Sequence, residues 1–223
     1  ALAGRRCSNR VLDLVDAIPT DASPGVVASG LGAMTGLYGM FEEDPARQKR
    51  IAAYASKKYG PVLDRLGFTP RAEDTAPESN LRASLISSLG YMGDPKVLAE
   101  ANRLFAALDN DPKAMDGPLR GTWLGIVATN ADAATWDKLH KMAKSANSAV
   151  LQNTLYGLLG AAKDPKLAQK ALDLALSGEP PATTAPGMIA RVSGWHPDMA
   201  FDFVLANLDK VKAIVDGPSQ SEF

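Results

Sequence analysis

The residues that could support metal or nucleophilic chemistry are few and far apart in this chain of 223 residues. His140 and His196 are the two histidines, and neither belongs to an H-E-x-x-H pattern, which would place two zinc ligands one helical turn apart. With Cys7 as the single cysteine, the chain can form neither a Cys/His zinc site of the usual kind nor an intrachain disulfide. We therefore expect no catalytic residue and no metal ligand in this chain, and a structural role for both histidines.

Motifs for nucleophilic catalysis and for phosphate binding are also missing from the sequence. It contains no G-x-S-x-G, no G-x-x-x-x-G-K-[ST] and no G-x-G-x-x-G after a strand. The glycines at positions 30, 32, 36 and 39 lie within a helical pattern. In that setting we expect them to permit close packing between helices.

Three arginines on otherwise apolar helices are the remaining polar candidates: Arg82, Arg120 and Arg191. Arginine suits carboxylate recognition because its planar fork can bind both oxygens at once. The alternative is a structural role, in which each guanidinium forms a salt bridge or contacts backbone carbonyls between helix layers. The sequence leaves both interpretations open.

Composition restricts the possible partners of the chain. Charged residues make up 22%, the net charge is −1, and hydrophobic residues make up 46%. A near-zero charge gives no long-range attraction to nucleic acid or to an anionic membrane. Since no apolar run reaches the roughly 18–20 residues that span a bilayer, we expect neither a nucleic-acid nor a membrane partner. The compartment stays open between the cytoplasm and, in a bacterium, the periplasm or the exterior.

Signals for the start and the end of a helix recur along the chain. Asp-Pro occurs at 44–45, 94–95, 111–112 and 164–165. Aspartate is a good N-cap and proline is tolerated at the first helical position, so each pair predicts a helix start. Gly67, Gly93 and Gly178 follow apolar runs and predict helix stops, because glycine readily takes the left-handed conformation that ends a helix.

Between these signals, apolar residues recur at three- and four-residue spacing, which predicts about eleven helices. No segment alternates strictly, so we expect no sheet. The expected helices cover residues 9–17, 24–41, 45–66, 78–92, 95–108, 118–129, 132–145, 148–162, 165–177, 186–194 and 198–213.

A weak internal similarity predicts how these helices are arranged. The segment LGYMGDPKVLAEANRLF at 89–105 is echoed by LLGAAKDPKLAQKALDLAL at 158–176. Short connections make sequential helices antiparallel neighbours, and self-similarity is the mark of a repeat architecture. We predict one all-α domain over residues 1–223, a right-handed α-α superhelix of stacked antiparallel helix pairs of the HEAT or armadillo kind.

Several short motifs, in order, resemble the C-terminal helical domain of the aminopeptidase N-like zinc aminopeptidases, which include the puromycin-sensitive and endoplasmic reticulum enzymes. They are Leu66-Gly67-Phe68, Glu73-Asp74, Asn80-Leu81-Arg82, Leu119-Arg120, the Trp-x-x-Leu at 136–139 and the segment from Ala200 to Asn207. The resemblance extends over roughly residues 10–213. Phenylalanine stands at positions 68 and 201, where the family carries tryptophan.

This resemblance implies a non-catalytic C-terminal domain of a zinc metallo-aminopeptidase. Such a domain would cap the active-site cavity of its parent enzyme and help to select and hold peptide substrates. It implies zinc in the parent's catalytic domain and no cofactor in this chain. The implied partners are the parent's own catalytic and N-terminal domains and the peptide. Arg82, Arg120 and Arg191 would then be candidates to contact the peptide in the cavity.

The alternative from another class is a free-standing HEAT-like scaffold that binds other proteins. The two interpretations differ in what should precede Ala1. A fragment of an aminopeptidase, which is the interpretation we favour, requires an upstream H-E-x-x-H followed by a glutamate ligand. A free-standing scaffold requires neither.

Overall fold

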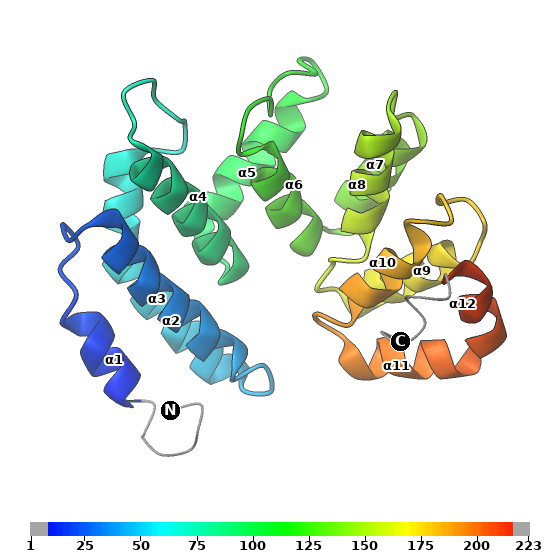
Figure 1. The fold of residues 1–223 in the computed structure, drawn as a ribbon, viewed down its shortest axis with the longest axis horizontal. Coiled ribbons are helices and arrows are strands. Elements are labelled where there is room, and N and C mark those ends of the chain that lie inside the picture. Colours follow the sequence, from blue (N-terminus) through cyan, green and yellow to red (C-terminus); the bar gives the residue numbers. More distant parts are fainter. Residues whose placement is uncertain (1–8, 216–223) are drawn as a thin grey trace. The chain divides into compact units, whose positions relative to one another are not determined.

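The computed structural model describes residues 9–215, and these residues form twelve α-helices and no strand (Figure 1). The all-helical prediction is therefore confirmed. The number exceeds the predicted eleven because the helix expected at 198–213 is divided at Asn207 into α11 (Pro197–Ala206) and α12 (Leu208–Ile214). Asn207 takes a non-helical conformation at the junction, with φ −123° and ψ 27°.

The helices fall into two compact units, which are divided between Trp123 and Leu124, inside α6 (Arg120–Thr129). Besides the start of α6, the first unit contains the helices α1 (Asn9–Asp16), α2 (Pro24–Gly39), α3 (Pro45–Leu66), α4 (Ala76–Tyr91) and α5 (Pro95–Ala107). Besides the rest of α6, the second contains α7 (Ala133–Lys144), α8 (Ala149–Leu159), α9 (Pro165–Ala175), α10 (Ala185–Val192), α11 and α12.

In the first unit, α2 is the central helix. It contacts α1, α3 and α4, and α4 in turn contacts α5. Met34 of α2, Tyr59 of α3 and Leu85 of α4 are completely buried. Their burial follows from the helical spacing of apolar residues, which gives each helix one face to place against its neighbours.

Three of the four Asp-Pro pairs begin helices, as predicted. Asp44, Asp94 and Asp164 each accept a hydrogen bond from a backbone N–H in the first turn of α3, α5 and α9. The prediction for the pair at 111–112 is wrong, because Asp111 instead accepts from the N–H of Lys113 in a turn between α5 and α6.

The predicted stop glycines adopt the expected backbone. Gly67 follows the last residue of α3 with φ 73°, while Gly93 and Gly178 lie in the turns after α4 and α9 with φ 83° and 80°. Gly117 also has a positive φ, of 124°, and turns the chain just before α6. These are conformations that residues with a Cβ rarely adopt.

Of the glycines predicted to permit close helix packing in α2, Gly30 has that role most clearly. A Cβ at Gly30 would lie 2.6 Å from the hydroxyl of Tyr59 and 3.0 Å from the side chain of Ile18. Around Gly32 and Gly36 nothing lies within 4 Å of the same position. The prediction is therefore wrong for those two glycines, which face away from the neighbouring helices.

In the second unit, α8 contacts α7, α9 and α10. Trp136 of α7 is buried, and its indole N–H donates to the carbonyl of Leu159 at 3.1 Å. The backbones of α8 and α10 approach closely at Gly160, where a Cβ would lie 2.5 Å from the carbonyl oxygen of Met188. These contacts fix α7 and α10 against the same helix.

Candidate functional site

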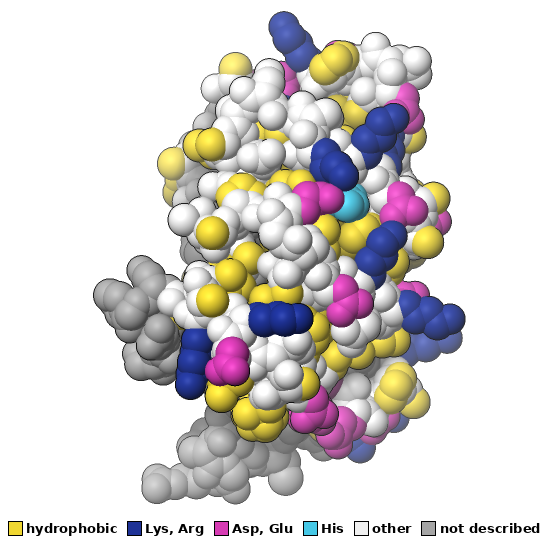
Figure 2. All heavy atoms as spheres, turned by 90° about the vertical axis from the view of Figure 1, so that its right-hand side faces the viewer, with side chains coloured by type: hydrophobic (Ala, Val, Ile, Leu, Met, Phe, Trp, Pro, Cys, Tyr) yellow, Lys and Arg dark blue, Asp and Glu magenta, His cyan; other side chains and the backbone are white. Residues whose placement is uncertain are grey.

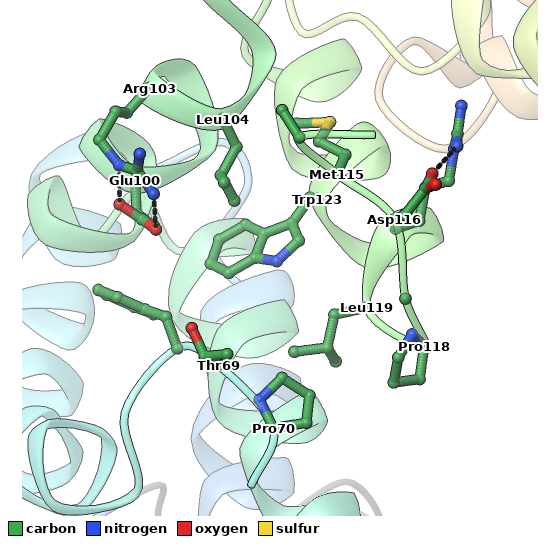
Figure 3. Close-up of a pocket in the computed structure, with 14 residues that line it drawn as sticks. Thr69, Pro70, Glu100, Arg103, Leu104, Met115, Asp116, Pro118, Leu119 and Trp123 are labelled. Carbon is green, nitrogen blue, oxygen red and sulfur yellow. Dashed lines mark hydrogen bonds and ion pairs between the residues drawn. The ribbon is translucent and has the colours of Figure 1, made fainter. Parts of the chain in front are cut away.

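A cavity of about 140 Å³ lies in the first unit, between two connecting segments and α5 (Figure 3). One connecting segment follows α3 and contributes residues 68–70. The other precedes α6 and contributes residues 114–119. The apolar side chains that line the cavity are Phe68, Pro70, Leu104, Ala114, Met115, Pro118, Leu119 and Trp123.

The ring of Trp123 is the centre of this cavity. It lies across the middle of the view in Figure 3, in the first turn of α6. Phe68 packs edge-on against it, with the ring centroids 5.7 Å apart. Met115 and Leu119 are buried beside it. Since Gly67 turns the chain immediately before Phe68, the stop signal of α3 also places one wall of the cavity.

Two acid–arginine pairs lie at the rim. Glu100 and Arg103 form a bidentate pair on α5, with both N–O distances 2.8 Å. Arg120 contacts Asp116 at 2.5 Å across the start of α6. The bond to Arg103 lowers the pKa of Glu100. The rim is therefore polar, but each positive charge is matched by a negative one within a helical turn.

Arg82 of α4 forms hydrogen bonds to the backbone of the segment that carries Phe68. The guanidinium is 1% exposed, contacts Asp74 at 2.5 Å and donates to the carbonyls of Leu66 and Gly67, both at 3.0 Å. Asp74 also accepts from the backbone N–H of Arg71 at 2.6 Å. The hydrogen bond to Arg82 is the main cause that lowers the pKa of Asp74 to about 2.

The same segment is anchored where it enters α4. Thr75 is the N-cap of α4 and forms a capping box with Glu78, in which each side chain bonds the other residue's backbone N–H. Such reciprocal bonds satisfy two donors that a helix start would otherwise leave free. The segment between α3 and α4 is therefore fixed at both ends, and the position of Phe68 is fixed with it.

The three arginines predicted from sequence have different environments. Arg120 lines the cavity. Arg82 does not line it, and its contacts favour the structural alternative that the sequence left open. Arg191 lies exposed on α10 in the other compact unit and forms no side-chain hydrogen bond or ion pair within residues 9–215. Their role in contacting a peptide stays a prediction.

In the sequence, Trp123 is recognisable only as an apolar helix residue, and the pairing of Glu100 with Arg103 was not predicted. One sequence signal for this site is the Leu66-Gly67-Phe68 turn, because it places an aromatic residue directly after the end of a helix. Nothing in the spacing pairs that turn with Trp123, which is 55 residues further along (123 − 68).

A second polar cluster lies in the second unit, around Glu179 in the turn between α9 and α10. The carboxylate of Glu179 is bonded by His140 at 2.5 Å, Lys144 at 3.0 Å and Tyr156 at 3.0 Å. The bond to His140 is the largest cause that lowers the pKa of Glu179 to about 2. Burial, with the bond to Glu179, raises the pKa of Tyr156 to about 12. His140 thus has a structural partner, as predicted.

The other residues that could bind a metal ion do not form a cluster within residues 9–215. His196 occupies the N-cap position of α11, and Cys7 lies outside the described residues. Within residues 9–215, no three His, Cys, Asp or Glu side chains form a group that could hold a metal ion. Among the same residues, no helix is both long enough and apolar enough to cross a membrane.

The surface in Figure 2 carries lysine and arginine side chains interspersed with aspartate and glutamate. Hydrophobic atoms are exposed between them. On the face shown, the charges therefore do not form a patch of one sign.

Comparison with known proteins identifies related sequences. The family model described as "ERAP1-like C-terminal domain" matches residues 1–222. Aminopeptidase 2 of the yeast Candida albicans (strain SC5314 / ATCC MYA-2876) is 25% identical over 135 residues, which are 60% of this chain and 15% of that protein. The chain thus matches a small part of this much longer relative. It belongs to the ERAP1-like C-terminal domain family, the helical C-terminal part of M1-type aminopeptidases.

Proposed function

We propose that this chain is the non-catalytic C-terminal domain of a zinc aminopeptidase, where it caps the active-site cavity and helps to select and hold peptide substrates. The family match supports the parent activity. The observation that carries the binding role is the cavity around Trp123, whose apolar walls and polar rim suit a peptide side chain next to its backbone. In the parent, zinc would supply the activated water that attacks the first peptide bond.

In this proposal, Arg120 and Arg191 contact the peptide and Arg82 positions the segment that carries Phe68. Arg120 is 32% exposed at the cavity rim and Arg191 is exposed, so both can reach a ligand. Arg82 is buried and occupied by Asp74 and two carbonyls, so it would act through the shape of the cavity.

The test uses the full-length parent enzyme. Arg120→Gln and Arg191→Gln should raise KM for long peptides while leaving the cleavage of an aminoacyl chromogenic substrate unchanged, because the small substrate does not reach this domain. Ala134→Leu, at an exposed position of α7, is the control and should alter neither. Equal kinetics of all variants on long peptides would contradict the proposed role.

The isolated chain provides a second test of the same proposal. It should not hydrolyse aminoacyl chromogenic substrates, and metal analysis should find no stoichiometric zinc. Hydrolysis or bound zinc in the isolated chain would show that the chemistry is not confined to another domain.

One observation favours the scaffold alternative. Phe201, Leu205 and Leu208 on α11 and α12 are 63%, 56% and 42% exposed. Phe201 also borders a hollow of about 400 Å³ between α10 and α11. Exposed apolar groups of this size are typical of interaction surfaces. If the parent reading frame lacks H-E-x-x-H, this surface becomes the leading candidate for function.

A further inference from the structure

The indole N–H of Trp123 is a donor without a protein acceptor in the described part of the chain, and it lies beside the cavity. Trp123 is 4% exposed, yet no acceptor among residues 9–215 bonds its Nε1. The other buried tryptophan, Trp136, does have an acceptor, the carbonyl of Leu159. Buried tryptophan N–H groups usually find a partner, and one that lacks a partner requires an explanation.

The position of this donor explains why it is unpaired. In Figure 3 the nitrogen lies on the edge of the ring that faces Leu119, within the space enclosed by the lining residues. The N–H is not completely enclosed by protein, since it is absent from the fully buried unpartnered groups. It is therefore available to an acceptor that enters the cavity.

The size and lining of the cavity define the ligand. A cavity of about 150 Å³ is large enough for a benzene ring, and this one measures about 140 Å³, with apolar walls and charged residues at its rim. Its walls include Phe68, Leu104, Met115 and Leu119. A leucine or phenylalanine side chain matches both the volume and the lining.

The rim argues against a free carboxylate as part of that ligand. Arg103 is held by both oxygens of Glu100, and Arg120 contacts Asp116 at 2.5 Å. Each guanidinium already has an anion, so a second carboxylate would have to displace it or share it. A neutral amide with a carbonyl oxygen fits the unpaired indole donor without that competition.

We propose that this cavity binds a leucine- or phenylalanine-sized side chain from the interior of a peptide, whose backbone carbonyl accepts a hydrogen bond from Trp123 Nε1. This inference rests on the proposed function only in taking a peptide as the ligand. It differs from the role predicted for Arg120, because the recognised group is an uncharged backbone and not a carboxylate.

The experiment uses the 223-residue chain labelled with ¹⁵N and blocked peptides as probes. Ac-Gly-Gly-Phe-Gly-Gly-NH₂ should bind about 10-fold or more tightly than the same peptide with alanine, since burying a large apolar side chain contributes about 1.5–3 kcal/mol. Among the indole signals of the three tryptophans, that of Trp123 should move, while that of Trp136 should stay. Trp123→Phe assigns the signal by removing it.

Two variants test separately the contribution of the Trp123 N–H and that of the cavity volume. Trp123→Phe keeps an aromatic ring but lacks the N–H, and should weaken binding about 2- to 12-fold, the value of one hydrogen bond. Ala114→Leu places a larger side chain in the lining and should abolish binding, whereas Ala134→Leu on exposed α7 should not. Circular dichroism of each variant confirms that the helices are retained.

Three results would overturn the inference: equal binding of the phenylalanine and alanine peptides, movement of the Trp136 signal alone, or tighter binding of a peptide that ends in a free carboxylate at the phenylalanine. Failure of the proposed function is separate. If the chain binds the peptide as expected but Ala114→Leu in the parent leaves long-peptide kinetics unchanged, the cavity exists without the proposed role. If Ala114→Leu alters the kinetics of the parent but the chain does not bind the peptide, the proposed function would be supported and the proposed ligand of the cavity would be wrong.

Discussion

Replacing Arg82 with methionine should strongly destabilise the first unit. The substitution keeps most of the aliphatic volume but removes the partner of Asp74 and the donors to the carbonyls of Leu66 and Gly67. The side chains of Arg82 and Asp74 are 1% and 7% exposed, so solvent cannot replace the lost contacts without movement of the segment.

The expected magnitude follows from that burial. Removing the Arg82 guanidinium leaves the carbonyls of Leu66 and Gly67 without their donor, and a buried acceptor left unsatisfied costs about 1–3 kcal/mol. Small globular proteins are stable by only about 5–15 kcal/mol in total. We therefore expect Arg82→Met to lower the free energy of unfolding by about 2–6 kcal/mol for the two carbonyls together, a large fraction of the stability of the chain.

Urea unfolding followed by circular dichroism measures this loss. Lys96→Met is the matched control, because the Lys96–Asp64 pair has a similar distance, 2.8 Å, but both side chains are more than half exposed. That control should unfold at nearly the same urea concentration as the unsubstituted chain. Adding Asp74→Leu to Arg82→Met should recover part of the loss. A loss below about 1 kcal/mol for Arg82→Met would contradict the claim that buried Arg82 stabilises the segment between α3 and α4.

Two further predictions concern the second unit. Because the pKa of Glu179 is about 2 in the folded chain, below its ordinary 4.5, its contribution to stability is complete above about pH 4.5 and is lost as the pH falls toward 2. The urea midpoint should therefore fall less between pH 7 and pH 3 in Glu179→Gln than in the unsubstituted chain. The expected difference in the free energy of unfolding is about 1–2 kcal/mol for a carboxylate that is 31% exposed. An unchanged pH dependence would show that the His140 and Lys144 bonds contribute nothing. Gly160→Ala should cost about 1–3 kcal/mol because its Cβ meets the Met188 carbonyl, whereas Gly157→Ala, with open space, should be neutral or stabilising. Equal effects of the two changes on thermal unfolding would contradict the close approach.

The helices could be predicted because their signals are local. An aspartate before proline caps the helix that follows it, and this holds at Asp44, Asp94 and Asp164. The prediction failed at Asp111 because Pro118 follows too soon, and the residue before a proline avoids the helical conformation. Gly117 is that residue, and its φ of 124° is incompatible with a helix.

The contacts between helices could not be predicted, because they depend on which face meets a neighbour. Gly30 and Gly32 are two residues apart on one helix, yet only Gly30 faces Tyr59. The candidate site depends on such contacts throughout. The sequence identified Arg82 and Arg120 as unusual, but it could not show that one is buried under Asp74 and the other lies at the rim of a cavity.

The three tryptophans are divided between the two compact units. Trp123 is the last residue of the first unit, while Trp136 and Trp195 belong to the second. Fluorescence from a chain with Trp136→Phe and Trp195→Phe would report on the first unit alone, and Trp123→Phe would leave only reporters of the second. Coincident melting curves would mean that the units unfold cooperatively, as the predicted single domain requires. Separate curves would mean that α6 joins two independently folding bodies.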